Sequence, residues 1–165
     1  GPVRLATPAG VARIDVESAR DMAAAVDAAL PVDAAVMVAA VADWRTVDCA
    51  GGKIKKSGDG PPALQLTENP DILAGLGHSA QRPRLLIGFA AETSDVIQHA
   101  QAKLARKGAD WIIANDVSCQ NGQSVMGGEV NTVHIIRASG VESLSEMPKA
   151  DVARAIVERI ADALR

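Results

Sequence analysis

Three apolar runs, each followed closely by polar residues, constrain the fold of this chain more than any other feature. The runs cover residues 34–41, 85–89 and 111–114, and the polar residues after them are Asp43, Glu92, Asn115 and Asp116. A continuous apolar run bounded by turn signals is typical of a strand buried on both faces. Such strands form parallel sheets, and open α/β folds bind ligands at the carboxyl edge of these sheets. The pattern therefore predicts a single polar cleft at that edge.

The composition indicates a globular chain and limits its partners. Of its 165 residues, 48% are hydrophobic and 22% are charged, which is enough apolar surface for one well-packed domain. The net charge of −3 gives no general attraction to nucleic acid or to acidic membranes, so we expect neither as a partner. Cys49 and Cys119 lack metal-ligand spacing, which favours two free thiols in the cytoplasm.

The first half of the chain predicts a mixture of strands, helices and one long loop. Residues 11–16 alternate as a short strand does, and Ser18 can cap a helix that Pro31 stops. The loop at 42–62 is rich in Gly and Lys, and its residues 53–55 could pair with residues 64–66. Asn69 then caps a helix, with Pro70 at its first position, that runs to about residue 77.

The second half alternates strands with helices. Strands are predicted at 84–89, 110–114 and 131–136, with a helix at 94–107 that Gly108 ends. Pro148 opens the last helix, whose apolar face comprises Val152, Ala155, Ile156, Ile160 and Leu164. This alternation predicts an α/β fold with a Rossmann-like, doubly wound, mostly parallel sheet.

Two common nucleotide-binding signatures are absent from the sequence. It contains neither the G-x-G-x-x-G dinucleotide fingerprint nor the G-x-x-x-x-G-K-[ST] loop that cradles phosphates. Its three histidines, His78, His99 and His134, are scattered and favour ordinary surface roles. The sequence supports neither a Ser-His-Asp triad nor a zinc site.

Asp43 and the lysine cluster after it each have a structural and a functional interpretation. Asp43 is either a turn residue or a carboxylate that faces ribose hydroxyls or a phosphate-bound cation. Lys53, Lys55 and Lys56 are either a solvated edge or a set of cations for a polyphosphate.

The same ambiguity holds for the later candidates. The Asn69-Pro70-Asp71-Ile72 segment is a simple helix start, or it offers backbone N–H groups to a ligand. Phe89 packs in the core or stacks on a nucleobase. Lys103 and Lys107, one helical turn apart, form a solvated face or share an anionic ligand.

The order of these motifs is more specific than any one of them. The segments at 39–45, 53–56, 69–72, 88–93 and 114–117 together resemble phosphopantothenoylcysteine synthetase, the phosphopantothenate–cysteine ligase family of coenzyme A synthesis. The resemblance implies that the phosphopantothenate carboxylate attacks the α-phosphate of CTP, with loss of pyrophosphate. The amine of L-cysteine then attacks the acyl-cytidylate and releases CMP. CTP is a co-substrate in this scheme, and Mg²⁺ is expected on its triphosphate.

The resemblance also implies roles for particular residues. Lys53 matches the catalytic lysine, and Asp43 is the candidate contact to the metal. The nucleotide-binding positions that it implies are Met37, Val38, Ala39, Asp43, Lys53, Pro70, Asp71, Ile72, Leu73, Phe89, Lys103 and Lys107.

Further expectations concern the whole protein. The family forms homodimers with the active site near the subunit boundary, and in bacteria a flavin-dependent decarboxylase is usually fused upstream. The family's opening strand and glycine-rich turn have no counterpart here, so residues 1–165 are expected to be the ligase domain without its first strand–turn–helix unit. Two alternatives stay open, namely an NAD(P)- or flavin-linked oxidoreductase on a Rossmann-like fold and a non-catalytic binding module.

Overall fold

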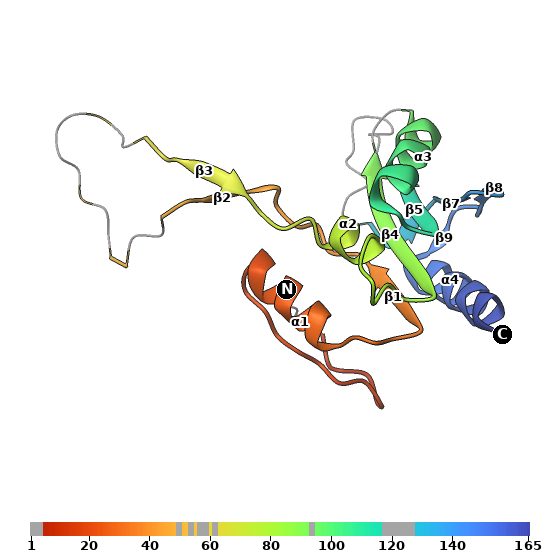
Figure 1. Ribbon diagram of the computed structural model, residues 1–165. Coiled ribbons are helices and arrows are strands. Elements are labelled where there is room, and N and C mark those ends of the chain that lie inside the picture. Colours follow the sequence, from red (N-terminus) through yellow and green to blue (C-terminus); the bar gives the residue numbers. More distant parts are fainter. Residues whose placement is uncertain are drawn as a thin grey trace. The chain divides into compact units, whose positions relative to one another are not determined.

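The computed structural model divides the chain into two compact units (Figure 1). Unit 1 comprises Gly1–Ala28 and Ala40–Asp71, and unit 2 comprises Ala29–Ala39 and Ile72–Arg165. The residues that the structure describes are 5–48, 51–52, 55, 60, 63–92, 95–116 and 128–165.

Unit 2 is built on a mixed sheet of strand order β1-β4-β5-β7-β8. The strands are β1 (Ala34–Met37), β4 (Leu85–Glu92), β5 (Trp111–Asp116), β7 (Val133–Arg137) and β8 (Gly140–Ser143). The first three are parallel to one another, as the apolar runs predict, whereas β7 and β8 continue the sheet antiparallel. A separate short pair joins β6 (Val130–Asn131) to β9 (Met147–Pro148). The predicted α/β class with a parallel central sheet is therefore confirmed.

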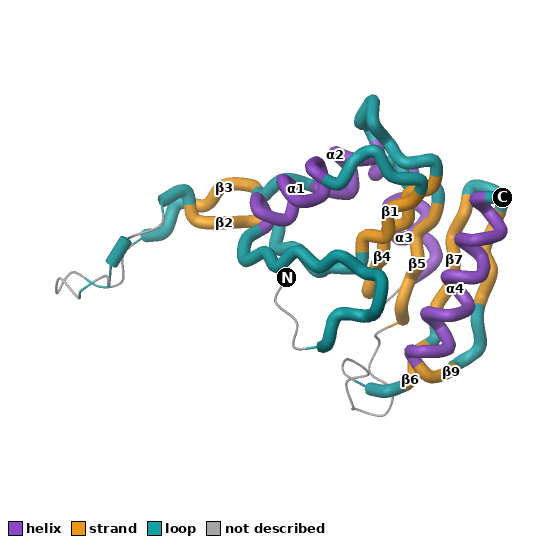
Figure 2. The backbone as a smooth tube through the Cα atoms, turned by 90° about the horizontal axis from the view of Figure 1, so that it is seen from below, coloured by secondary structure: helices purple, strands orange, loops and turns teal. Residues whose placement is uncertain are grey.

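Helices cover both faces of this sheet (Figure 2). On one face, α4 (Lys149–Leu164) packs through Val152 and Ile156 onto alternate residues of β4, β5 and β7. On the other, α3 (Val96–Lys107) and the short α2 (Ile72–Gly77) pack onto the intervening residues. The predicted apolar face of the last helix is confirmed. The sheet residues with 0% exposure are Leu86, Ile87, Ile112, Ile113, Ala114, Val133, Ile135 and Ile136.

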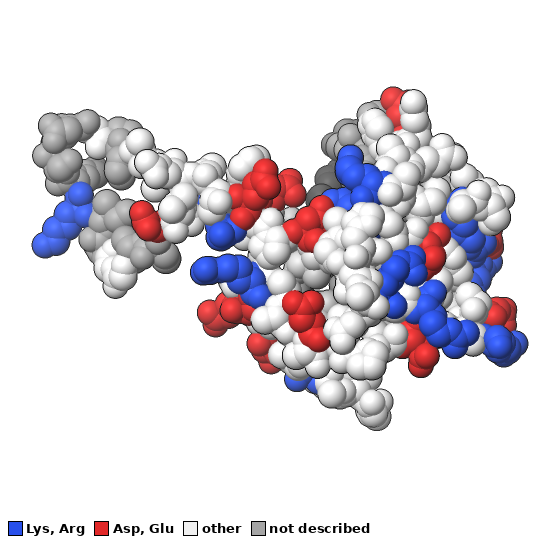
Figure 3. All heavy atoms as spheres, in the orientation of Figure 1, with Lys and Arg blue, Asp and Glu red and all other residues white. Residues whose placement is uncertain are grey.

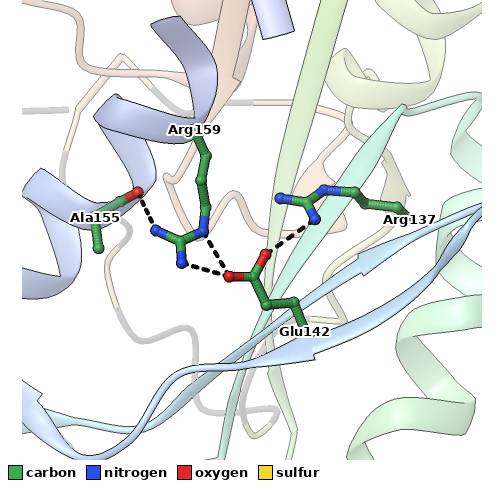
Figure 4. A network of polar contacts seen from close by, with 4 residues as sticks. All are labelled: Arg137, Glu142, Ala155 and Arg159. Carbon is green, nitrogen blue, oxygen red and sulfur yellow. Dashed lines mark hydrogen bonds and ion pairs between the residues drawn. The ribbon is translucent and has the colours of Figure 1, made fainter. Parts of the chain in front are cut away.

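A charged network ties α4 to the β7–β8 hairpin (Figure 4). Glu142 on β8 accepts hydrogen bonds from Arg159 of α4, at 2.8 Å from Nε, and from Arg137 of β7, at 3.0 Å. The Arg137 guanidinium also lies 4.5 Å from the centre of the Trp111 ring, which is a cation–π contact. The hydrogen bonds from Arg159, and secondarily from Arg137, hold the pKa of Glu142 below its usual value.

The amino end of the sheet is closed by a second polar cluster and by a close helix contact. Arg82 and Asp110 form an ion pair at 2.8 Å, and the Asp110 carboxylate accepts a hydrogen bond from the Leu86 backbone N–H. Nearby, α2 ends against the end of α3, so that a Cβ at Gly77 would lie 2.0 Å from the Lys107 carbonyl oxygen. Gly108, with φ 61°, ends α3 as the sequence predicts.

Unit 1 contains a helix and a two-stranded ribbon. Helix α1 (Ala19–Ala28) begins with a reciprocal cap, in which Ser18 and Asp21 exchange side chain–backbone hydrogen bonds. The ribbon pairs β2 (Trp44–Thr46) antiparallel with β3 (Leu66–Glu68). No described residue of unit 1 is fully buried, so caps and backbone pairing contribute much of its order.

The structure corrects several predicted elements. Residues 11–16 form no strand, because no described segment pairs with them and Val11 and Ile14 stay exposed. The strand predicted at 34–41 ends at Met37. Residues 64–65 lie outside any strand, and β3 pairs with β2 rather than with residues 53–55, of which 53 and 54 lie outside the described residues. Alternation in sequence identifies a possible strand face but not the partner strand.

Gly77→Ala is predicted to destabilise the protein by about 2 kcal/mol, because the new methyl group meets backbone that cannot rotate away. Chemical denaturation measures the change in unfolding free energy. Gly75→Ala is the matched control in the same helix, since a Cβ there meets nothing within 4 Å. The control should be neutral or slightly stabilising. Equal losses in both variants would contradict the packing argument.

Glu142→Gln is predicted to lower the unfolding free energy by about 1 kcal/mol at pH 7, since solvent screens this partly exposed network. The carboxylate has a lowered pKa in the folded state, so its contribution is fully present above the pKa of an ordinary Glu side chain, about 4.3. That contribution disappears as the pH falls through the folded-state value. Denaturation curves of the two proteins should therefore converge in acid. Exposed Glu146→Gln, the control, should change little at either pH.

Candidate functional site

The carboxyl half of β1 and β4 gathers several predicted nucleotide-binding residues within unit 2. Met37 pairs in register with Gly88, and Phe89 is the next residue of β4. Leu73 of α2 lies over Gly88, since a Cβ at that glycine would be 2.5 Å from the Leu73 Cδ2 atom. Three further predicted nucleotide-binding residues are neighbours in the chain, since Val38 and Ala39 follow Met37 and Ile72 precedes Leu73. The structure thus brings Met37 and Leu73 together at Gly88, while the adjacent Phe89 packs on the opposite face of the sheet.

Phe89 is half-buried and packs against the core cluster beneath α4. Its ring therefore has the core-packing role that the sequence left open. Part of the residue remains accessible, and it belongs to the same sheet face as Trp111 and Ile113. Contact with a nucleobase stays a prediction.

Lys103 and Lys107 are both half-buried on α3. Helix α3 follows β4 and runs back along the sheet, so its last turn lies beside Gly77, at the amino end of the strands. At 1.5 Å of rise per residue, Lys107 is roughly 16 Å along α3 from its first residue. The structure therefore separates Lys107 from the group at the carboxyl edge.

In unit 1, Asp43 directly precedes β2, and its side chain is exposed. Its carbonyl oxygen accepts a hydrogen bond of 2.7 Å from the Asn69 N–H, while the Asn69 side-chain amide donates to the Ala42 carbonyl at 2.8 Å. Asn69 therefore joins the two strands at the base of the ribbon. The prediction that Asn69 caps the following helix is wrong, because α2 begins at Ile72, after Pro70 and Asp71.

A small open hollow of about 230 Å³ also belongs to unit 1. It lies between the start of α1, including Ser18 and Met22, and the segment Ala40–Ala42, with Asn69 at its margin. Along the chain these alanines separate the predicted nucleotide-binding residue Ala39 from Asp43. The volume suits one part of a small ligand rather than a whole nucleotide.

The catalytic candidate Lys53 lies outside the described residues, as does Lys56, and Lys55 is exposed. Among the residues that the structure describes, no group of three His, Cys, Asp or Glu side chains could hold a metal ion. A single exposed carboxylate such as Asp43 fits Mg²⁺, because Mg²⁺ is usually held by one or two carboxylates together with substrate phosphates.

The charged surface of unit 2 is mixed. In the view of Figure 3, Lys and Arg side chains alternate with Asp and Glu, so no broad field of one sign is visible on that face. Within the described ranges, no helix has the length and apolar character needed to span a bilayer.

A mixed sheet with a parallel centre, covered by helices on both faces, defines an α/β domain. Residues 1–164 match the family model described as DNA/pantothenate metabolism flavoprotein C-terminal domain. The chain belongs to this family.

Individual relatives agree with that assignment. The chain is 40% identical over 161 residues to the coenzyme A biosynthesis bifunctional protein CoaBC of Haemophilus influenzae, which covers 97% of this chain and 39% of the relative. It is 40% identical over 167 residues to CoaBC of Mycobacterium tuberculosis, covering 94% of this chain and 39% of that protein. The chain therefore spans about two fifths of the length of these curated relatives.

Solved structures show the same fold. The crystal structure of a CoaBC C-terminal domain superposes with a TM-score of 0.75 at 35% identity, covering 96% of this chain and 69% of that one. The DNA/pantothenate metabolism flavoprotein from Streptococcus pneumoniae has a TM-score of 0.69 at 17% identity, with 89% of this chain and 71% of that chain covered, and supports the fold alone.

Asn69→Ala is predicted to open the base of the ribbon. Removing the donor to the Ala42 carbonyl should cost about 1 kcal/mol locally, which corresponds to roughly fivefold faster amide exchange at Asn69 and Val47. Hydrogen exchange followed by NMR measures the change. Amides of β5, in unit 2, are the internal control and should keep their exchange rates. Unchanged exchange at Asn69 would show that its side chain does not hold the ribbon.

Proposed function

We propose that this chain is the ligase part of a coenzyme A biosynthesis protein, and that it joins 4′-phosphopantothenate to L-cysteine with CTP. The observation that carries the proposal is the 40% identity to bifunctional CoaBC over nearly the whole chain. The ordered motifs of the sequence support the same reaction, and the absence of a dinucleotide fingerprint weighs against an oxidoreductase.

The proposed reaction has two steps. A carboxylate oxygen of phosphopantothenate bonds to the α-phosphorus of CTP, and the bond to the β-phosphate oxygen breaks to release pyrophosphate. The cysteine amine then bonds to the acyl carbon, the acyl–phosphate bond breaks to release CMP, and the amine loses a proton. Negative charge gathers on phosphoryl oxygens in the first step and on the acyl oxygen in the second. Fixed cations and oriented N–H groups should therefore lower both barriers.

The proposed residue roles follow the same chemistry. The group around Met37 and Phe89 contacts the nucleoside part of CTP, and Asp43 faces the ribose or the phosphate-bound metal. Lys53 stabilises charge in the transition states, and Lys103 binds the nucleotide, whereas Lys107 is left out of the proposal because it lies at the amino end of the sheet. Mg²⁺, when bound, neutralises the triphosphate. Because the relatives are bifunctional and more than twice as long, we include an upstream decarboxylase in the proposal. We also propose that the protein forms a homodimer and is located in the cytoplasm.

The test is a coupled assay on the full-length native protein. With phosphopantothenate and CTP, pyrophosphate should form without cysteine, and CMP should appear when cysteine is added. Replacing CTP by ATP should lower the rate strongly. Thermal unfolding with CTP–Mg²⁺, ATP–Mg²⁺, NAD or FMN gives an independent readout, since a specific ligand raises the melting temperature. A larger shift with NAD or FMN, without pyrophosphate release, would favour the oxidoreductase alternative.

Asp43→Asn is predicted to weaken CTP binding by roughly tenfold while changing the unfolding free energy by about 0.5 kcal/mol or less. The physical reason is that this side chain is exposed, while its backbone carbonyl makes the structural contact with Asn69. Calorimetric titration and thermal unfolding measure the two effects. Asp48→Asn, an exposed aspartate after β2, is the control. Unchanged affinity with a large fall in melting temperature would make Asp43 structural.

Lys53→Gln is predicted to lower turnover by roughly 100-fold, a loss of about 3 kcal/mol of transition-state stabilisation. The affinity for CTP should fall less, because other lysines and Mg²⁺ still bind the triphosphate. Lys56→Gln, the control in the same basic cluster, should affect turnover much less. Pyrophosphate release measured with and without cysteine separates the two steps. Wild-type turnover in Lys53→Gln would remove this lysine from catalysis.

A further inference from the structure

The first turn of α2 packs into a gap in the unit 2 sheet. Gly88 lies in the middle of β4, and its lack of a side chain leaves the space that the Leu73 side chain of α2 occupies. A Cβ atom at Gly88 would lie 2.5 Å from the Leu73 Cδ2 atom and 3.0 Å from the Ile112 Cδ1 atom. Non-bonded carbon atoms pack best at about 3.5–4.0 Å. The gap therefore fits a leucine against a glycine and has no room for one more methyl group.

The sheet holds the backbone of Gly88 in place on both sides. Gly88 pairs in register with Met37 of β1 and with Ile112 of β5, and Ile112 is wholly buried. A shift of Gly88 would disturb the hydrogen bonds of both neighbouring strands. The strain from a methyl group at this position would therefore be relieved by movement of Leu73 rather than of the strand.

The other end of α2 is held by a backbone contact. A Cβ atom at Gly77, the last residue of the helix, would lie 2.0 Å from the Lys107 carbonyl oxygen, so α2 already lies against the end of α3 there. A helix of six residues has little stability of its own, and its position depends on contacts of this kind. Because the Gly77 end is fixed, pressure on Leu73 would lift the first turn of α2 away from β4.

That first turn contains two residues of the predicted nucleotide site. Ile72 and Leu73 begin α2, and the Leu73 side chain packs against the buried cluster that includes Ile112. We propose that Gly88 is a positioning residue for nucleotide binding, which acts through Leu73 by setting the distance between the first turn of α2 and β4. This inference rests on the proposed binding of CTP.

The inference gives the Leu73 side chain a role that differs from direct contact with the nucleotide. A side chain that touches CTP would weaken binding whenever it is shortened. A side chain that acts as a spacer between α2 and β4 should instead restore binding when it is shortened opposite a methyl group at Gly88. Leu73→Val retracts both methyl groups by one carbon, so the sign of its effect in the Gly88→Ala background separates the two roles.

The experiment measures the dissociation constant of CTP with Mg²⁺ by calorimetric titration of the full-length native protein, at a temperature where the variants are folded. Gly88→Ala should weaken binding roughly tenfold. The double variant Gly88→Ala/Leu73→Val should bind within about threefold of the wild type, although Leu73→Val alone should bind no more tightly than the wild type. Gly75→Ala is the matched control in the same helix, since a Cβ there meets nothing within 4 Å, and it should keep the wild-type affinity.

Amide hydrogen exchange of the ligand-free protein tests the movement of α2 without any nucleotide. The amides of α2 should exchange several-fold faster in Gly88→Ala than in the wild type, and Leu73→Val should reverse the change. Amides of β7, on the far side of β5, are the internal control and should keep their exchange rates. Unchanged exchange in α2 would show that the helix does not move, which would overturn the inference.

The binding data contain further results that would overturn the role of Gly88. Wild-type affinity for CTP in Gly88→Ala, whatever its melting temperature, would make this glycine purely structural. Restoration of binding by Ile112→Val in place of Leu73→Val would exclude Leu73 as the route. A wild type that binds no CTP would overturn the proposed function as well, whereas tight wild-type binding that Gly88→Ala does not weaken would overturn this role alone.

The two double variants keep the inference testable if Gly88→Ala does not fold by itself. A folded Gly88→Ala/Leu73→Val protein that binds CTP within about threefold of the wild type would support the inference. The same affinity in Gly88→Ala/Ile112→Val, without recovery in the first double variant, would overturn it.

Discussion

The burial of β4 and β5 on both faces is the constraint on which the rest of unit 2 depends. Their central residues are wholly removed from water, so each face needs a helical cover, α4 on one side and α2 with α3 on the other. Side chains inside such a sheet must be apolar, because an unpaired polar group there is costly. Polar residues are therefore confined to strand ends. Polar side chains that could contact a ligand must therefore lie at an edge of the sheet, because its apolar interior cannot accommodate them.

The described part of unit 1 is stabilised by local hydrogen bonds and not by a buried core. Its described residues include no buried side chain, and the ribbon exposes the apolar residues Trp44, Leu64 and Leu66 at or next to its strands. Local hydrogen bonds, such as the Ser18–Asp21 cap and the Asn69 contacts, maintain its conformation. Segments of this kind open more easily than a packed core. Substitutions at exposed positions of unit 1 should consequently have small effects on global stability.

Most of the polar side chains of unit 2 described above are paired, and two buried atoms among the described residues, Asn115 Oδ1 and Arg137 Nε, have no hydrogen-bond partner. Glu142, Arg159, Arg82 and Asp110 satisfy one another and fasten helices and loops to the sheet. Their distance from the carboxyl edge and their complete pairing mark them as structural. Asn115 differs, since its oxygen is buried, lies at that edge and has no donor among the described residues.

Local signals in the sequence were sufficient for much of the fold. The apolar runs identified β1, β4 and β5, Gly108 identified the end of α3, and the spacing around Val152 identified the buried face of α4. The ordered motifs also led to the family that the comparisons show. These features depend on the spacing and backbone preferences of residues close together in the sequence, which are largely independent of long-range contacts.

Other features were decided only by the tertiary structure. The antiparallel course of β7 and β8, the pairing of β2 with β3, and the lack of any strand at residues 11–16 all depend on which edges are available. Asn69 bonds across the ribbon instead of capping a helix, and Lys107 lies at the amino end of the sheet, away from the other candidates. Strand pairing and side-chain environment are long-range properties. They are decided when segments distant in the sequence compete for the same hydrogen bonds and the same buried surface. A local sequence pattern contains no information about that competition.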